Sequence, residues 1–499
     1  MSSFIRTLLN RLPQSPKALL LIAAVAFVLV RWLAVVYNEA YAFNVAEEEM
    51  IYSTLAAERL RGNELVDDML YQEYTTGGFW LQTHLYKPLI KLGGCSRYAM
   101  KWLPIGFSLI AFLFYLLLAD RWLGRRAAVI FALLFTLGDP LLLQHQIVGY
   151  ANHNELHVFF APILLLTFYL LFTREPLLWP ALATAFGVGL LTTSAIFYSY
   201  SAMVFALFLL LLSPFILARL IRQLGVKAWA TLPVAALGLL LGSLPAWWLR
   251  LTIAHKAFGV YHTETGSGAF FLSSLIEGLR FLFGGAWLLF PSGIAPHMFC
   301  FDESALNVFL FLVFSVCLLA ALALGFRCLL HRGDGQTPIA AALLALPVLF
   351  YLLAFAWNWR DAAWTPYDDS ASSALLHYHQ MVVFLPFVYL TVAGVLAAGL
   401  AAVRKGARAI TWATLIVLLV LGLHSLGTVT VYPARQFVHE QCTNYKVLTQ
   451  KNIVAIEYNL PPGQVCEAVN RYAISYDPVH AEEICAVIRS ETDCLCPFD

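Results

Sequence analysis

Long apolar runs separated by polar segments form the main pattern of the chain. The runs fall at about residues 18–37, 103–120, 127–145, 156–173, 178–196, 201–218, 228–249, 305–326, 337–357, 381–403 and 410–430. A helix needs about 20 apolar residues to cross about 30 Å of hydrocarbon, because it rises about 1.5 Å per residue. Membrane β-barrels instead use strands of about ten residues with alternating polarity. The pattern therefore predicts an all-α polytopic membrane protein with about eleven transmembrane helices.

Three longer polar segments divide the chain into regions. We expect a transmembrane domain over residues 1–430 that contains a long first outer loop at 38–102 and a second large outer segment at 250–304. The remaining residues, 431–499, are predicted to form a small extracytoplasmic domain. The first run is followed by no small-residue cleavage site, so it is interpreted as an anchor and not as a secretory signal.

The positions of Lys and Arg predict the orientation. Fifteen of them lie in short segments beside the runs: Arg6, Arg11, Lys17, Arg121, Arg125, Arg126, Arg174, Arg219, Arg222, Lys227, Arg327, Arg332, Arg404, Lys405 and Arg408. Cations near span ends favour the cytoplasmic side, which places the N-terminus there. An odd number of spans then places the C-terminus outside.

Composition supports the membrane assignment and narrows the partners. Hydrophobic residues make up 60% and charged residues 12% of the 499 residues, against about 45–50% and about 25% in soluble domains. The net charge of +1 argues against a nucleic-acid partner.

Cysteines gather near the C-terminus. Five of the nine lie in the last 58 residues and are disulfide candidates: Cys442, Cys466, Cys485, Cys494 and Cys496. Small exported domains commonly rely on disulfides, so an oxidising outer compartment is expected. A metal or redox role for Cys494 and Cys496 is the less favoured alternative. The sequence contains no Asn-x-Ser/Thr sequon, and with the compact loops this favours a bacterial inner membrane with a periplasmic C-terminus.

Carboxylates open the first outer loop. Glu48 and Glu49 follow the first apolar run closely and are candidates for a catalytic base with a raised pKa. The alternative is a solvated helix start, since acids favour the first turn of a helix. Residues 50–61 resemble an amphipathic surface helix, which would hold the carboxylates at headgroup depth. Residues 78–90 mix aromatic and basic side chains and form a second interfacial candidate.

Further polar side chains flank later runs. The candidates for substrate binding are Asp139, His145, His153, Asn154, Glu155, Arg250, Lys256, Arg360, His377 and His379. Charged groups at a bilayer edge usually face a cavity or a partner, although a polar loop end needs neither. Arginine and histidine beside aromatic residues could bind a lipid phosphate, and ordinary snorkelling at a span end is the alternative.

Several motifs follow one another in a recognisable order. They are Arg31 in the first span, Glu48-Glu49 with Tyr52 and Ala56, Asp139 to Leu142, Asn152 to Glu155, Phe159 to Pro162, Leu191 to Ser194, and His377 to His379 before Pro386. In this order the chain resembles the polyprenyl-phosphate-sugar-dependent glycosyltransferases of the GT-C superfamily, especially the protein mannosyltransferase and lipid A aminoarabinose transferase branch. The resemblance covers about residues 20–215 and, more loosely, 370–400. The chain departs from the family in carrying Glu48 where aspartate is preferred, and in lacking the arginine of the second acidic motif and the lysine of the fifth-span motif.

The resemblance implies a GT-C-like fold and a transfer reaction at the outer face. Glu48 or Glu49 would deprotonate an acceptor hydroxyl, which displaces a polyprenyl phosphate from the sugar with inversion. Arg250, Arg360, His377 and His379 would stabilise the phosphate, while His153 or Glu155 would orient the acceptor.

The resemblance also bears on partners. The expected ones are a polyprenyl-phosphate sugar donor and a lipid, glycan or protein acceptor. The C-terminal domain could cover the active site, recognise the acceptor or dock a membrane-protein partner. No cofactor is expected, and a divalent cation at Asp67 and Asp68 is a less favoured alternative. A non-catalytic subunit of a membrane assembly and a lipid or sugar transporter are the competing functions.

Overall fold

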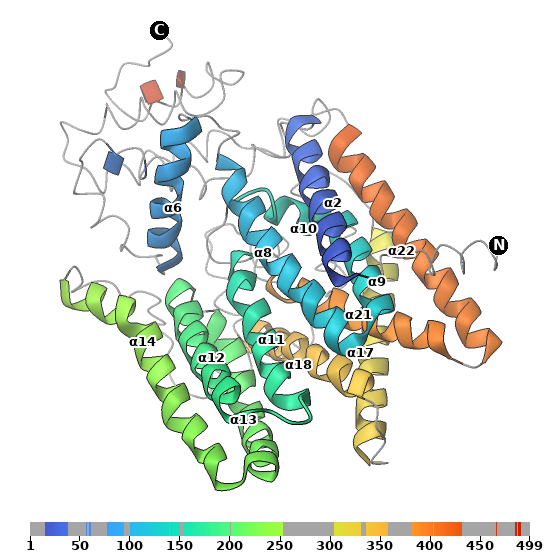
Figure 1. Cartoon of the computed structure of the whole chain (residues 1–499). Helices are drawn as coiled ribbons and strands as arrows, with labels where there is room; N and C mark the ends of the chain where they lie inside the picture. The colour runs from blue at the N-terminus through green and yellow to red at the C-terminus, as the bar shows by residue number, and fades with distance from the viewer. Residues whose placement is uncertain are drawn as a thin grey trace.

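A computed structural model of the 499-residue chain describes fifteen ranges of residues. They are 15–37, 56, 59–60, 77–93, 100–138, 140–149, 154–199, 201–252, 304–330, 336–357, 382–402, 404–431, 466, 485–486 and 488–490. Every regular element within these ranges is helical (Figure 1).

The longer helices follow the apolar runs. They are α2 (Pro16–Tyr37), α6 (Gly77–Gly93), α8 (Trp102–Leu118), α9 (Arg125–Leu137), α10 (Pro140–His145), α11 (His157–Phe172), α12 (Leu178–Tyr198), α13 (Ala202–Leu224), α14 (Thr231–Thr252), α17 (Ser304–Leu330), α18 (Gln336–Trp357), α21 (Leu385–Ala401) and α22 (Lys405–Val431). Short turns of other helix types are η1 (Ala119–Leu123), η2 (Asn154–Leu156), η3 (Gly225–Ala230) and η6 (Val382–Phe384). Apart from α6, each of the longer helices falls on a predicted run, and α9 and α10 share the run at 127–145.

The helices identify a multi-pass membrane protein. Among the described residues, seven helical stretches are long and apolar enough to cross a bilayer, and one of them, Ala202–Trp248, covers both α13 and α14. Leu312–Cys328 and Leu385–Ala401 are shorter apolar helices. The all-helical membrane architecture is therefore confirmed for the described ranges, whereas eleven spans remain a prediction.

The predicted span at 127–145 is not one helix. α9 has only 13 residues, which is about 20 Å of helix and short of the bilayer core of about 30 Å. Gly138 then adopts a φ of 44°, which favours glycine, and α10 begins at Pro140, which fits the first position of a helix. Leu142, Leu143 and Ile147 are completely buried. The apolar residues after the break therefore pack inside the protein.

Stacked aromatic rings fill the core between the N-terminal helices. The ring of Phe112 on α8 lies 4.9 Å from that of Phe27 on α2 and 5.3 Å from that of Phe135 on α9. Deeper in the bundle, every residue of α21 from Leu385 to Gly394 is buried. A helix that is apolar on all sides belongs in a core, so α21 is the central helix of the C-terminal half.

Two glycines allow α12 and α14 to touch. A Cβ at Gly189 would overlap the carbonyl oxygen of Ala235, and a Cβ at Gly238 would overlap that of Phe186. Small residues let membrane helices approach this closely. The contact holds α12, whose last residue is Tyr198, in a fixed position.

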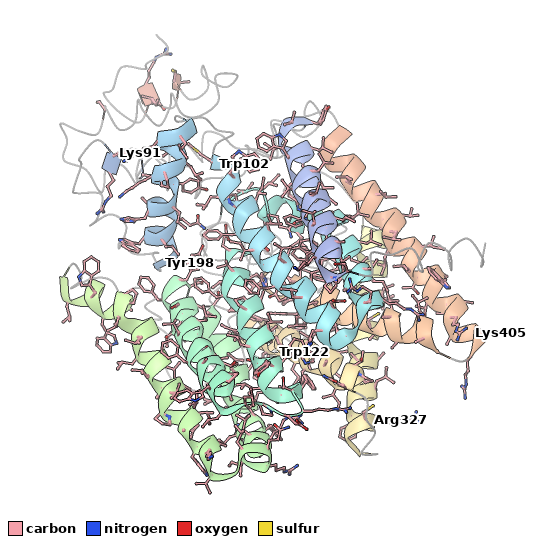
Figure 2. All side chains as sticks on the ribbon, in the orientation of Figure 1. Lys91, Trp102, Trp122, Tyr198, Arg327 and Lys405 are labelled. Carbon is pink, nitrogen blue, oxygen red and sulfur yellow. The ribbon has the colours of Figure 1, made fainter. Side chains whose placement is uncertain are left out.

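The labelled charges lie at opposite ends of the bundle. Figure 2 shows Lys91 and Trp102 at one end and Arg327 and Lys405 toward the other. Arg327 and Lys405 belong to the short segments that are predicted to be cytoplasmic, so α6 lies at the predicted outer end. Which end faces the cytoplasm remains a prediction.

Candidate functional site

α6 lies at the predicted outer end of the bundle, beyond the end of α12 and beside the start of α8 (Figure 1). It is not among the candidate membrane spans. Its buried Tyr86 and Ile90 pack with Ala56 and Met100 in a small apolar cluster separate from the main core. A Cβ at Gly77, the first residue of α6, would overlap the Phe197 ring of α12. α6 therefore has an apolar anchor of its own and meets the bundle at the end of α12.

The contact between α6 and the bundle includes buried polar groups. Gln82 Nε2 donates a hydrogen bond of 2.8 Å to the hydroxyl of Tyr198, and both residues are 1% exposed. Thr83, the next residue of α6, is completely buried. Gln82 Oε1 and Thr83 Oγ1 have no hydrogen-bond partner among the described residues.

The polar contact continues from Tyr198 across the bundle. The ring of Phe159, four residues after Glu155 in the chain, lies 5.4 Å from the ring of Tyr198, and Glu155 is 1% exposed. Asn154, its neighbour in η2, donates a hydrogen bond of 2.8 Å from Nδ2 to Ser108 Oγ on α8. We call this set of six residues the outer polar cluster: Gln82, Thr83, Ser108, Asn154, Glu155 and Tyr198. It brings together residues from α6, α8, η2 and α12.

A second face of α6 carries cations. Trp80, His84, Lys87 and Lys91 recur at intervals of three and four residues, so they share one side of the helix. The rings of Trp80 and His84 lie 4.3 Å apart. His84 Nδ1 donates a hydrogen bond of 2.8 Å to the carbonyl oxygen of Trp80, because that oxygen only accepts.

These cations repel one another. Burial lowers the pKa of His84 below its ordinary value; the hydrogen bond to Trp80 opposes this, while Lys87 and Arg59 add to it. Burial also lowers the pKa of Lys87, with further contributions from Arg59 and Lys91. We call His84, Lys87 and Lys91 the α6 cationic face. Crowded cations at a membrane surface favour the binding of an anion such as a phosphate.

Arg31 organises a second buried polar contact. It is completely buried in α2. Its Nε donates a hydrogen bond of 3.0 Å to Gln146 Oε1, and its Nη2 donates one of 2.7 Å to the carbonyl of Phe135. Its Nη1 donates to the carbonyl of Thr136, and the guanidinium lies 3.7 Å from the ring centroid of Phe27.

These contacts explain how the interrupted third run is held. The two carbonyls belong to the last turn of α9, where carbonyls lack partners within the helix and a cation is favourable. We call Arg31, Gln146 and these two carbonyls the Arg31 clamp. The clamp ties the end of α9 and the buried segment after α10 to α2.

A histidine and a tyrosine fix the start of α11. The hydroxyl of Tyr115 and Nδ1 of His157 share a hydrogen bond of 2.6 Å, and both residues are buried. The His157 ring meets the ring of Phe387 at 5.4 Å, edge to face. Because His157 follows Glu155 by two residues, this contact also positions the outer polar cluster.

The predicted site residues divide into those that are described and those that are not. Asn154 and Glu155 come together with Ser108 and Tyr198, whereas His145 is buried beside Gln146 in the chain. Arg250 belongs to α14, but its side chain lies outside the described part. The other predicted residues also lie outside it: Glu48, Glu49, Asp139, His153, Lys256, Arg360, His377 and His379.

Only part of the cysteine prediction falls on described residues, and the metal prediction stays a prediction, because Asp67 and Asp68 lie outside them. Cys466 and Cys485 are disulfide-bonded, while Cys442, Cys494 and Cys496 lie outside the described residues. Within the described ranges, no three His, Cys, Asp or Glu side chains come together in a way that could hold a metal ion.

Sequence reasoning missed several residues of the site. Gln82 and Tyr198 are separated by 116 positions, and a single polar residue at a helix end gives no signal. Arg31 did give a sequence signal, because it is the charge inside the first apolar run. Its partners Phe135, Thr136 and Gln146 could not be named from spacing.

Comparisons with known proteins give a distant likeness. No protein-family model matches the chain, and no curated protein does. Among solved structures, the chain is similar to ArnT from Cupriavidus metallidurans in the apo state, with 14% identity, a TM-score of 0.41, and coverage of 96% of this chain and 90% of that one. For the same protein bound to undecaprenyl phosphate, the identity is 14%, the TM-score 0.39, and the coverage 90% and 82%. At this level the likeness assigns no role to any residue of this chain.

Proposed function

We propose that the protein is an integral membrane glycosyltransferase of the GT-C type. It moves a sugar from a polyprenyl-phosphate donor to an acceptor hydroxyl at the outer face of a bacterial inner membrane. The observation that carries the proposal is that the α6 cationic face lies on the same helix as the buried Gln82 and Thr83 of the outer polar cluster. One helix thus presents groups suited to a phosphate next to groups suited to hydroxyls.

The α6 cationic face supports the phosphate part of the proposal. The leaving group of the reaction is a lipid phosphate, and donors directed at its developing charge accelerate the transfer. His84 and Lys87 are half-buried on an amphipathic helix, next to the ring of Trp80. An amphipathic helix with cations beside an aromatic ring suits the headgroup region of a membrane. Arg250, Arg360, His377 and His379 are proposed to add to the same binding.

The reaction itself needs a base. Glu48 or Glu49 takes the proton of the acceptor hydroxyl, and the hydroxyl oxygen forms a bond to the anomeric carbon of the sugar. The bond from that carbon to the phosphate oxygen breaks, and the lipid phosphate leaves with the electron pair. Attack opposite the leaving group inverts the configuration. Glu155 or His153 orients the acceptor, and no cofactor takes part.

Two observations bear on the competing functions. Arg31, the charge inside the first span, is held by hydrogen bonds to Gln146 and to carbonyls of α9, which disfavours its use in a transport path. The departures from the family motifs favour a non-catalytic subunit as the second candidate. Such a subunit would bind the lipid or a partner without transferring the sugar.

The test is a release assay on purified protein. Undecaprenyl- and dolichyl-phosphate sugars are supplied as a panel, each together with lipid, glycan and protein acceptors. The lipid phosphate released is measured for the native chain and for Glu48→Gln, Glu49→Gln and Lys87→Gln. We expect one glutamine substitution to lower release by about 100-fold or more, the usual contribution of a general base. Lys87→Gln lowers kcat/KM, while Lys405→Gln, at the opposite end of the bundle, serves as the matched control and changes nothing.

The same assay decides between the candidates. No release from any donor, with folded protein that still binds undecaprenyl phosphate, contradicts the transferase and favours the non-catalytic subunit. Movement of lipid across a reconstituted bilayer without an acceptor would instead identify a transporter.

A further inference from the structure

Two buried polar atoms of α6 have no hydrogen-bond partner among the described residues. They are Gln82 Oε1 and Thr83 Oγ1, on residues that are 1% and 0% exposed. Buried polar side-chain atoms in proteins are nearly always hydrogen-bonded, so each exception calls for an explanation. A bound ligand that supplies the missing partners is one such explanation.

The neighbouring groups define the chemistry of that ligand. Gln82 Nε2 already donates to the hydroxyl of Tyr198 at 2.8 Å, so Gln82 Oε1 and Thr83 Oγ1 are the atoms that a ligand would meet. Amide and carboxylate oxygens accept hydrogen bonds, whereas the Thr and Tyr hydroxyls both donate and accept. A ligand that donates to Gln82 Oε1, and donates to or accepts from Thr83 Oγ1, would pair with both orphan atoms. Adjacent sugar hydroxyls have this property, while a prenyl chain has no such group and an ionised phosphate only accepts.

An orphan hydroxyl alone would not identify a site. Thr167 on α11 is also completely buried, and its Oγ1 likewise has no partner within the described part. It lies ten residues beyond His157, about 15 Å along the helix. Thr83 differs from it because Gln82, with a second orphan atom, is its neighbour and because the cations of α6 begin at the next residue. Lys87 lies four residues further, about 6 Å along the axis, which is the scale of one sugar ring.

We propose that Gln82, Thr83 and Tyr198 form a sugar subsite that binds the hydroxyls of the donor, while the α6 cationic face binds its phosphate. The subsite rests on the proposed function and extends it, since it assigns the choice of sugar to the buried side of α6.

The test compares donors with and without a sugar. The dissociation constants of undecaprenyl phosphate and of undecaprenyl phosphates that carry glucose, galactose, mannose or aminoarabinose are measured for purified protein in nanodiscs. We expect at least one sugar to tighten binding about tenfold over the bare lipid phosphate. Thr83→Val and Gln82→Leu each remove about threefold to tenfold of that preference, the worth of one hydrogen bond. Neither substitution changes the affinity for undecaprenyl phosphate itself.

Thr167→Val is the matched control, because it removes an equally buried hydroxyl of the same kind. Equal binding of bare and sugar-linked lipids by the native chain overturns the subsite but leaves the proposed function standing. An unchanged preference in Thr83→Val, as in Thr167→Val, does the same, and the near-isosteric valine keeps this result readable even if Gln82→Leu fails to fold. If the native chain binds none of the lipids, the proposed function fails and the subsite fails with it.

Discussion

The Arg31 clamp and the outer polar cluster both bury polar groups, but they bury them differently. In the clamp, the guanidinium donates from Nε, Nη1 and Nη2 to Gln146 and to the last turn of α9. Of the polar side-chain atoms of Arg31 and Gln146, only Gln146 Nε2 has no hydrogen-bond partner in the described part. In the outer polar cluster, two adjacent residues of α6 keep orphan atoms. A polar contact that is nearly complete fixes the fold, whereas one that is left open is available to a ligand.

Removing the arginine should have the largest effect on stability. Arg31→Met leaves Gln146 Oε1 and the carbonyls of Phe135 and Thr136 buried without their donor, at about 1–3 kcal/mol for each group. We expect the free energy of unfolding to fall by about 3–5 kcal/mol, measured by denaturant titration in detergent with circular dichroism. Lys405→Met, on an exposed cation, should stay within about 0.5 kcal/mol of the native chain. An equal response of the two variants would contradict the clamp.

Changing the glutamine should break less of the clamp. Gln146→Leu removes one acceptor for Arg31 but keeps the carbonyls of α9, and a hydrogen bond to a charged group is worth about 1.5–3 kcal/mol. The same titration should show a loss of that size. Gln146→Glu retains an acceptor for the guanidinium and should recover most of the loss. If the leucine variant is as stable as the native chain, Gln146 does not hold the segment.

The fold was more predictable than the site, and the reason is visible in particular segments. Apolar runs predict helices such as α2 and α12, because a helix that crosses the bilayer must be long and apolar. The same criterion failed at 127–145, since Leu141 to Leu143 are equally apolar whether they face lipid or pack inside the protein.

The residues of the candidate site were likewise predictable only in part. Asn154 and Glu155 were predicted because polar groups at a bilayer edge need partners. Their partners Ser108 and Tyr198, and Gln82 on α6, were not predicted, because contacts across more than 40 residues depend on how the helices pack.

Two small substitutions should separate complete from open polar contacts inside the outer polar cluster. Ser108→Ala leaves Asn154 Nδ2 without its acceptor and should destabilise the protein by about 1 kcal/mol. Thr83→Val removes a hydroxyl that has no partner in the described part, so stability should stay the same or rise slightly. Of the two thermal midpoints, measured without lipid, only that of Ser108→Ala should therefore fall. A fall in both would mean that Thr83 Oγ1 is already satisfied in the protein.

The smallest expected effect concerns the pH dependence of α6. Burial, aided by Lys87 and Arg59, lowers the pKa of His84 below its ordinary value of 6.5. Between that value and the lowered one, the unfolded chain binds a proton at this position that the folded chain does not. Stability should therefore decrease as the pH falls through this window and level off below it.

A bound phosphate favours the protonated imidazole and should raise the pKa of His84 again, which reduces the loss. The difference between the native chain and His84→Gln, followed by thermal midpoint from pH 7.5 to about 5 with and without undecaprenyl phosphate, isolates this residue from the other histidines. If the lipid leaves that difference unchanged, the α6 cationic face does not bind the phosphate. The proposed ligand of the outer polar cluster then loses its support.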